Sequence, residues 1–205
     1  GVCEVFQPAA GLDPGQIGNI QRYLDAVRSN LLFAKSVLLV EGDAEEILVP
    51  ILIRQVFGLS LDELGTSLIN IRSTGFENVA VLFHDMRIRK NCAIITDLDQ
   101  AFIDLTPDPL DSDAEIKAKS RALGSQTSGA ARSARLNAFC HDNAWLSAHF
   151  AQHTFEVDFI LAGNNAAVAS ILNDVYVDAG TIAQAKADLE SGDIARYGTR
   201  VLTMA

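Results

Sequence analysis

The sequence predicts an α/β fold with a mostly parallel sheet flanked by helices. Three short apolar runs, at 36–40, 67–72 and 91–96, have the length and composition of buried strands. Helical patterns separate them, and strands and helices that alternate at these lengths require right-handed crossovers between parallel strands. The composition allows such a core, since 49% of the 205 residues are hydrophobic.

The helical patterns follow from apolar spacing and from turn residues. Apolar residues recur at three- and four-residue steps over 17–33, which predicts a helix before the first strand. A second helix is expected over 44–57, with Asp43 as its N-cap and Pro50 as a kink. A third is expected over 77–86. Four apolar residues of the second helix are expected to face inward: Ile47, Leu48, Ile51 and Leu52.

The alternation ends near residue 104, in an acidic loop marked by prolines. Helical sequence is expected over 114–152 with a Gly- and Ser-rich hinge at 124–129, then a strand over 154–161 and helices over 164–190. We therefore expect four parts: a lead-in and linker helix at 1–30, an α/β core at 31–104, an acidic loop and helical insertion at 105–152, and a return strand with C-terminal helices at 153–205.

The net charge, the cysteines and the lengths of the apolar stretches bear on which classes of function are possible. A net charge of −10 argues against a generic basic nucleic-acid surface, although metal ions and a local basic patch can offset it. The three cysteines are scattered and form no CxxC pair, which favours a reduced, cytoplasmic protein. No apolar stretch reaches membrane-spanning length, so we expect no membrane partner.

Carboxylates follow the first and third expected strands. Glu41 and Glu45 come just after the first, and Asp97 and Asp99 end the third, with no Lys or Arg adjacent in sequence. Carboxyl ends of parallel strands meet at one edge of a sheet, where Thr74 is also expected. Gathered carboxylates are costly without partners. Oxygen ligands suit Mg²⁺ or Mn²⁺, and two ions about 3.5–4 Å apart can clamp a phosphodiester displacement.

Glu156 is a fifth candidate, because an acid is unexpected inside the strand-like run at 154–161. A structural ion pair explains it equally well. A zinc site is a weaker hypothesis, since its ligand spacing fits no standard finger. That site would use Cys140, His141, His149 and His153.

One stretch of this acidic chain is basic. No acid occurs between Ile116 and His141, and phosphate contacts from such a helix would give salt-sensitive, sequence-independent binding. A solvated helix face is an equally good interpretation. The candidate nucleic-acid-binding residues are Lys117, Lys119, Arg121, Arg132 and Arg135.

These residues resemble a known family. VEG at 40–42, with Glu45 one turn later, and TDLD at 96–99 are similar to the two motifs of the Toprim domain. Three longer segments resemble the OLD (overcoming lysogenization defect) family of ATP-dependent endonucleases: FAKSVLLVEGDAEEILVP at 33–50, STGFENVAVLF at 73–83 and TFEVDF at 154–159. The resemblance covers about 31–100 well and about 150–160 moderately.

The resemblance implies a Toprim-type sheet with an added or inserted helical subdomain, and a DNA endonuclease that uses two divalent metals, Mg²⁺ or Mn²⁺. Glu41 and Asp97 would bind one ion, and Glu41 would also move protons. Glu45, Asp99 and Glu156 would serve the second ion.

The resemblance also implies partners: DNA, a second copy in a homodimer, and an ATPase domain before this region. The chain has no GxxxxGK[ST] loop, so ATP would act only through that domain. The lysine that the family uses to steady the transition state has no obvious match before Ala205, and Lys186 lies in an Ala-rich helix.

Two other functions compete with a nuclease. One is Mg²⁺-dependent phosphotransfer through an aspartyl phosphate, although the DxD of such enzymes usually follows the first strand, not the third. The other is a non-catalytic metal-binding module for regulation or dimerisation.

Overall fold

The computed structural model describes residues 5–24, 28–72 and 75–204. The chain forms two compact units, each described by itself: unit 1 comprises Gly1–Thr96 and Ala134–Phe150, and unit 2 comprises Asp97–Ser133 and Ala151–Ala205. The four-part division expected from the sequence stays a prediction. The expected edge residue Thr74 lies outside the described residues.

A four-stranded sheet, in the order β2–β1–β3–β4, organises unit 1. Its strands are β1 (Ser36–Val40), β2 (Thr66–Asn70), β3 (Asn91–Asp97) and β4 (Leu146–Ala151). β1 pairs in parallel with both β2 and β3, so that Leu39 aligns with Ile69 on one side and Ile94 on the other. The predicted α/β fold with a mostly parallel sheet is confirmed.

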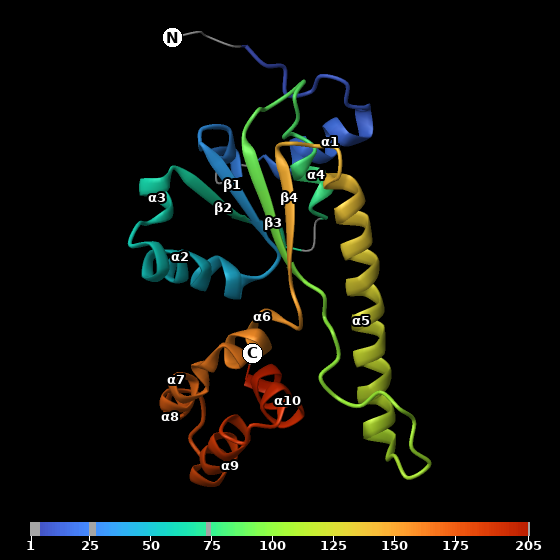
Figure 1. Ribbon diagram of the computed structural model, residues 1–205, viewed down its shortest axis with the longest axis vertical. Coiled ribbons are helices and arrows are strands. Elements are labelled where there is room, and N and C mark those ends of the chain that lie inside the picture. The colour runs from blue at the N-terminus through green and yellow to red at the C-terminus, as the bar shows by residue number, and fades with distance from the viewer. Residues whose placement is uncertain (1–4, 25–27, 73–74, 205) are drawn as a thin grey trace. The chain divides into compact units, whose positions relative to one another are not determined.

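Helices cover both faces of this sheet. They are α1 (Pro14–Tyr23), the 3₁₀-helix η1 (Arg28–Leu32), α2 (Asp43–Phe57), α3 (Leu61–Leu64) and α4 (Glu77–Ala80). Figure 1 shows α2 and α3 on one side of the strands, and α1 and α4 on the other. The main core lies on the α1 and α4 side, where Val37, Leu39 and Ile94 pack in one buried cluster with Val79 and Leu82.

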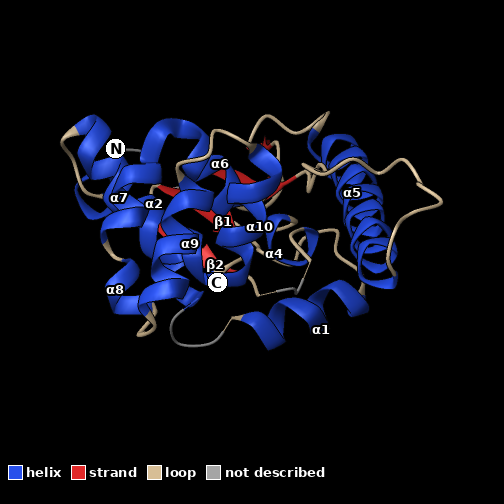
Figure 2. Cartoon of the chain, turned by 90° about the horizontal axis from the view of Figure 1, so that it is seen from below, coloured by secondary structure: helices blue, strands red, loops and turns tan. Residues whose placement is uncertain are grey.

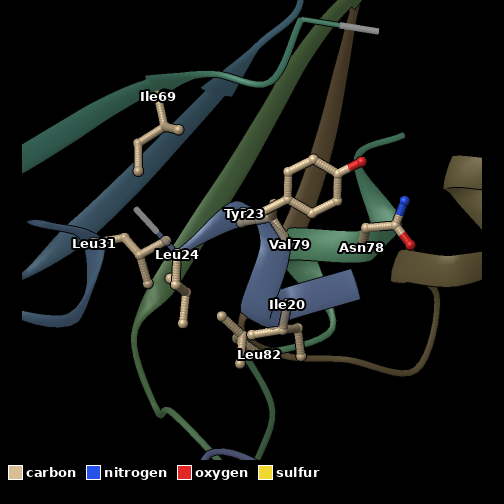
Figure 3. Close-up of a pocket in the computed structure, with 8 residues that line it drawn as sticks. All are labelled: Ile20, Tyr23, Leu24, Leu31, Ile69, Asn78, Val79 and Leu82. Atoms are coloured by element: carbon tan, nitrogen blue, oxygen red, sulfur yellow. The ribbon is translucent and has the colours of Figure 1, made fainter. Parts of the chain in front are cut away.

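Figure 3 shows the side chains that line a small cavity in this core. Ile20 of α1 and Leu24, the C-cap of that helix, meet Ile69, Val79 and Leu82 around a cavity of about 10 Å³. Such a volume holds at most one water molecule, and its lining is largely apolar. The cavity is a packing gap in the core, so α1 serves the fold and not a ligand site.

The prediction of which face of α2 is buried is wrong. Ile47 and Ile51 are 64% and 51% exposed, whereas the buried residues of α2 are Glu45 and Val49. These two are four residues apart and share a helix face. Asp43 is not the N-cap either: Gly42 occupies that position, and Asp43 is the first residue of the helix.

The expected strand over 154–161 is also wrong. β4 occupies 146–151, where a helix was expected, and 155–159 forms the helix α6 (Phe155–Phe159). Burial explains both outcomes: in β4 exposed residues alternate with less exposed ones, whereas beyond it Val157 and Ile160 are buried at helical spacing.

Three expected helices have different bounds. The helix expected over 17–33 is α1 followed by η1, with 25–27 outside the described residues. The one expected over 77–86 ends at Ala80. The helical insertion is a single 28-residue helix, α5 (Asp113–Cys140), which runs through the expected hinge without a break.

Unit 2 is helical. After α6 come the π-helix η2 (Ile160–Asn164), α7 (Asn165–Ser170), α8 (Leu172–Val175), α9 (Ala179–Leu189) and α10 (Ile194–Met204). Ile160, Leu172, Leu189, Tyr197 and Val201 form its buried core. Figure 2 shows the strands of the sheet in red and the helices of the chain in blue.

The described part of the chain holds two free thiols, Cys92 and Cys140, and burial raises the pKa of both. A thiol with a raised pKa is a poor nucleophile. None of the described helices has the length and apolar character needed to cross a bilayer.

Asp188 ties α9 to α10. Its carboxylate accepts hydrogen bonds from Arg200 at 2.7 Å, from Arg196 at 2.9 Å and from Gln184 at 2.9 Å. These donors, Arg200 first, lower the pKa of Asp188 to about 2. Because the folded state favours the carboxylate, this group stabilises unit 2 above its ordinary pKa and loses that effect as the pH falls through about 2.

We expect Asp188→Asn to lower the free energy of unfolding by about 1 kcal/mol near neutral pH, because two guanidinium groups lose their charged acceptor. The difference from the wild type should shrink as the pH falls toward about 2. Urea unfolding at several pH values measures it, with the exposed Asp174→Asn as control. A deficit that is constant across the pH range would contradict this account.

Candidate metal centre

Glu41 and Glu45 stand at the carboxyl end of β1 in unit 1. Leu39 pairs with Ile94, so the register brings Glu41 level with Thr96, two residues further along both strands. The Thr96 hydroxyl donates a hydrogen bond to the Glu41 carboxylate at 3.0 Å. Thr96 and Glu45 are only 1% and 6% exposed. Both glutamates are therefore held at the strand edge.

Gly42 makes room for Glu45. A methyl group at Gly42 would collide with the Glu45 carboxylate, which folds back over the start of α2. A glycine between the strand and the helix therefore lets the two glutamates occupy the same turn. In this arrangement the last residue of the VEG motif at 40–42 contacts the Glu45 carboxylate.

The other two acids of this turn have a structural role. The Asn70 amide donates to Asp43 at 2.8 Å and to Glu46 at 2.9 Å, which joins α2 to the end of β2. Arg72 Nη2 lies 3.5 Å from the Asp43 carboxylate. Negative charge in the first turn also suits the helix dipole. These contacts separate Asp43 and Glu46 from the candidate metal ligands.

Asp97 and Asp99 belong to unit 2. The backbone N–H of Phe155 donates to Asp97 Oδ2 at 3.2 Å. Asp99 has a φ of 53°, in the left-handed region that Asp tolerates better than most residues. Arg132 Nη2 donates to the Asp97 carbonyl at 2.7 Å and to the Asp99 carboxylate at 2.8 Å.

The pairing of Arg132 with Asp99 could not be predicted from neighbouring residues in the sequence. Arg132 lies 33 residues from Asp99, and α5 carries it to the carboxylate. It was expected to bind phosphate, and its observed partners are instead the DxD backbone and side chain. Thr96 was also missed, although a threonine inside a buried strand needs a hydrogen-bond partner and could have signalled one.

Glu156 lies in the first turn of α6, not in a strand as expected. Phe155, its neighbour, donates to the carboxylate of Asp97, so in unit 2 the start of α6 contacts the last residue of β3. Asp158 has a different task, since it accepts the backbone N–H of Gln152 at 2.8 Å and closes the turn before α6.

Lys119 and Arg135, two of the predicted nucleic-acid-binding residues, form ion pairs with carboxylates outside the candidate metal centre. Lys119 Nζ lies 2.7 Å from Asp111 Oδ2 and 2.7 Å from the Thr106 carbonyl, and so fastens the acidic loop to α5. Asp111 raises the pKa of Lys119 by this hydrogen bond. Arg135 pairs with Glu77 in unit 1.

Lys117 and Arg121 are exposed on α5, and within the described ranges no carboxylate pairs with either. Within the predicted nucleic-acid-binding set, these two exposed residues are the ones without an ion-pair partner among the described residues. Binding of nucleic acid by the basic set stays a prediction.

The zinc hypothesis receives no support. His149 lies in β4 beside Ser147, and the His153 ring lies 2.8 Å from the Gln100 carbonyl. Across residues 5–24, 28–72 and 75–204, no three His, Cys, Asp or Glu side chains converge on one point, and this holds for the five candidate carboxylates as well as for the zinc set. The candidate ligands bear only oxygen donors, which fit Mg²⁺ or Mn²⁺ better than zinc. A cation at Asp99 would compete with Arg132, whose Nη2 lies 2.8 Å from Asp99 Oδ2.

Comparisons with known proteins agree with this geometry. Residues 32–99 match the family model "Overcoming lysogenization defect protein-like, TOPRIM domain". The C-terminal region of the Burkholderia pseudomallei OLD protein has the same fold, with a TM-score of 0.56 and 19% identity over 84% of this chain and 81% of that one. No curated protein matches the chain in sequence.

The C-terminal region of the Xanthomonas campestris pv. campestris OLD protein is similar in two structures. The one phased with iodine has a TM-score of 0.52 at 19% identity, covering 84% of this chain and 78% of that one. The one phased with platinum has a TM-score of 0.51 at 18% identity, covering 86% and 80%.

The fold and its strand-end acids define a nuclease-like, metal-binding module of the Toprim type. The resemblance expected from the VEG and TDLD motifs is confirmed: residues 32–99 match the OLD-like Toprim domain, and the C-terminal regions of two OLD proteins have the same fold as this chain.

Gly129 lets α5 approach this site. A methyl group there would collide with the Leu98 backbone, inside the TDLD motif, and Arg132 lies on the same helix face one turn later. We expect Gly129→Ala to lower the free energy of unfolding by about 1–3 kcal/mol, because the backbone must move. Urea unfolding followed by circular dichroism measures this.

Gly124→Ala is the matched control, since nothing lies within 4 Å of a methyl group at that position of the same helix. It should raise the free energy of unfolding by about 0.5–1 kcal/mol through helix propensity. Equal effects of the two substitutions would show that the close approach at Leu98 does not constrain α5.

Proposed function

We propose that this chain is the nuclease module of an OLD-family protein, cleaving DNA phosphodiester bonds with divalent metal ions. The hydrogen bond from Thr96 to Glu41 carries the proposal. Asp97 directly follows Thr96, so this bond links the glutamate motif on β1 to the start of the DxD motif on β3. The parallel pairing of β1 and β3 supports the proposal that the two motifs serve one site.

Glu41 and Asp97 would hold one ion, and Glu45, Asp99 and Glu156 a second. A bound ion would supply positive charge for the phosphate and acidify a water molecule. Glu41 would accept a proton at its carboxylate, which the Thr96 hydroxyl orients. Arg132 would compensate Asp99 whenever the second ion is absent.

DNA is the proposed substrate, and its approach to a chain of net charge −10 requires local positive charge. Bound cations and the exposed residues Lys117 and Arg121 would provide it. We also propose an upstream ATPase domain and a second copy of the chain as partners, with ATP acting only through that domain.

A non-catalytic metal-binding module is the second candidate. One observation favours it: Asp99 is already paired with Arg132 at 2.8 Å, so the DxD motif is compensated without a metal. In that case the ion would regulate or assemble the protein and would not cleave DNA.

Nicking of supercoiled plasmid tests the proposal. With Mg²⁺ or Mn²⁺ the wild type should nick, and Glu41→Gln and Asp97→Asn should each lose about 100-fold in rate, or about 3 kcal/mol of transition-state stabilisation. Glu46→Gln is the control, because Glu46 bonds to Asn70 and should keep activity within about twofold.

The outcomes separate the candidates. Nicking that survives both Glu41→Gln and Asp97→Asn would reject the site. A wild type that nicks with none of Mg²⁺, Mn²⁺ and Ca²⁺, yet binds them, would favour the non-catalytic module.

Competition between Arg132 and the cation gives a second test. Without metal, Arg132→Gln should lower the melting temperature because Asp99 loses its partner. Added Mn²⁺ should then raise the melting temperature more than in the wild type, since the ion no longer displaces a guanidinium. Differential scanning fluorimetry with a Mn²⁺ titration measures both effects.

Arg135→Gln is the matched control, because it removes a guanidinium from the same helix that pairs with Glu77 instead. Its response to Mn²⁺ should equal that of the wild type. If Arg132→Gln responded no more strongly than Arg135→Gln, Arg132 would not compete with a cation.

A further inference from the structure

A cavity of about 350 Å³ opens in unit 2 beside Asp99. Its wall comes from the loop 99–103, from α5 over 118–125, from Thr154 and from α10 over 199–203. This volume falls within the range of small-molecule sites, which begin at about 300 Å³. The nuclease proposal uses Asp99 but leaves the rest of the cavity without a role.

The lining has the chemistry of a nucleotide site. Phe102 and Leu202 provide apolar surface, Ser125 and Thr203 provide hydroxyls, and Arg121 provides a positive charge. An apolar wall with a few convergent polar groups is typical of ligand pockets. Bases stack on aromatic rings, and guanidinium groups pair with phosphates.

The Phe102 ring is held in place before any ligand binds. It packs against Gly198, where an added Cβ would come within 2.8 Å of the ring. It also meets the His153 ring edge to face, with 6.2 Å between centroids. A fixed ring loses little entropy when a base stacks on it.

An unsatisfied hydroxyl adds a second, independent observation. Thr154 lines the cavity, and its Oγ1 is buried without a hydrogen-bond partner among the described residues. Thr154 is the N-cap of α6 but makes no side-chain cap hydrogen bond. A buried hydroxyl left unpaired destabilises a fold unless a ligand satisfies it.

We infer that this cavity binds one nucleotide of a DNA strand, with its base against Phe102 and a flanking phosphate at Arg121. Asp99 belongs both to the cavity wall and to the proposed metal centre. The bound nucleotide would therefore adjoin the bond to be cleaved. For its substrate, this inference rests on the proposed nuclease function.

Fluorescence anisotropy with a short, labelled single-stranded oligodeoxynucleotide in Ca²⁺ buffer tests the inference. Ser125→Trp should fill the cavity and weaken binding about tenfold, the effect of losing one stacked base. Ser128→Trp is the matched control: Ser128 is also exposed on α5, does not line the cavity, and should change binding by less than about twofold.

A second comparison, of two substitutions that each remove one positive charge, tests the inference without changing the size of the cavity. Arg121→Gln and Lys117→Gln each remove one exposed positive charge from α5, but only Arg121 lines the cavity. Arg121→Gln should weaken binding about fivefold more than Lys117→Gln. Thermal unfolding checks that all four variants fold.

Each outcome decides between named alternatives. Undetectable binding by the wild type, or equal binding by Ser125→Trp and Ser128→Trp, overturns the inference, and plasmid nicking by the same proteins would leave the nuclease proposal standing. Binding through the cavity without nicking supports the inference and overturns the nuclease proposal. A free mononucleotide that competes as well as the oligonucleotide would make the cavity a site for free nucleotides, and would overturn the assignment to a DNA strand.

Discussion

Negatively charged carboxylates follow the ends of β1 and β3, and local hydrogen-bond donors compensate the charge of most of them. In unit 1 the Thr96 hydroxyl binds Glu41, and the Asn70 amide binds Asp43 and Glu46. In unit 2 the Phe155 N–H binds Asp97, and Arg132 binds Asp99. Each donor comes from a different element, so the compensation of these charges depends on how the elements pack.

Much of the fold followed from short-range patterns. β1 and β3 are apolar runs that are followed by, or end in, acids. A shift of one residue in the register of either strand would move its buried side chains to the opposite face of the sheet. Glu41 and Asp97 could therefore be located from the sequence. Their hydrogen-bond partners could not, because Arg132 and Phe155 come from segments whose packing no local pattern specifies.

The errors have physical reasons as well. α2 is apolar around most of its circumference, so periodicity could not say that Ile47 faces out while Glu45 faces in. The Gly- and Ser-rich part of α5 was expected to bend. Gly129 instead gives the helix close access to Leu98, a use of glycine that the sequence cannot distinguish from a hinge.

Arg132 gives the DxD motif two chemically distinct states. With the guanidinium on Asp99, the protein's own cation compensates one of the two carboxylates of the motif. With a divalent ion there, the guanidinium would be released and would be free to pair with another anion. A DNA phosphate would favour the second state, because it can pair with the released arginine and with the ion together. Substrate and metal would then strengthen each other's binding, since each ligand favours the same arrangement of Arg132.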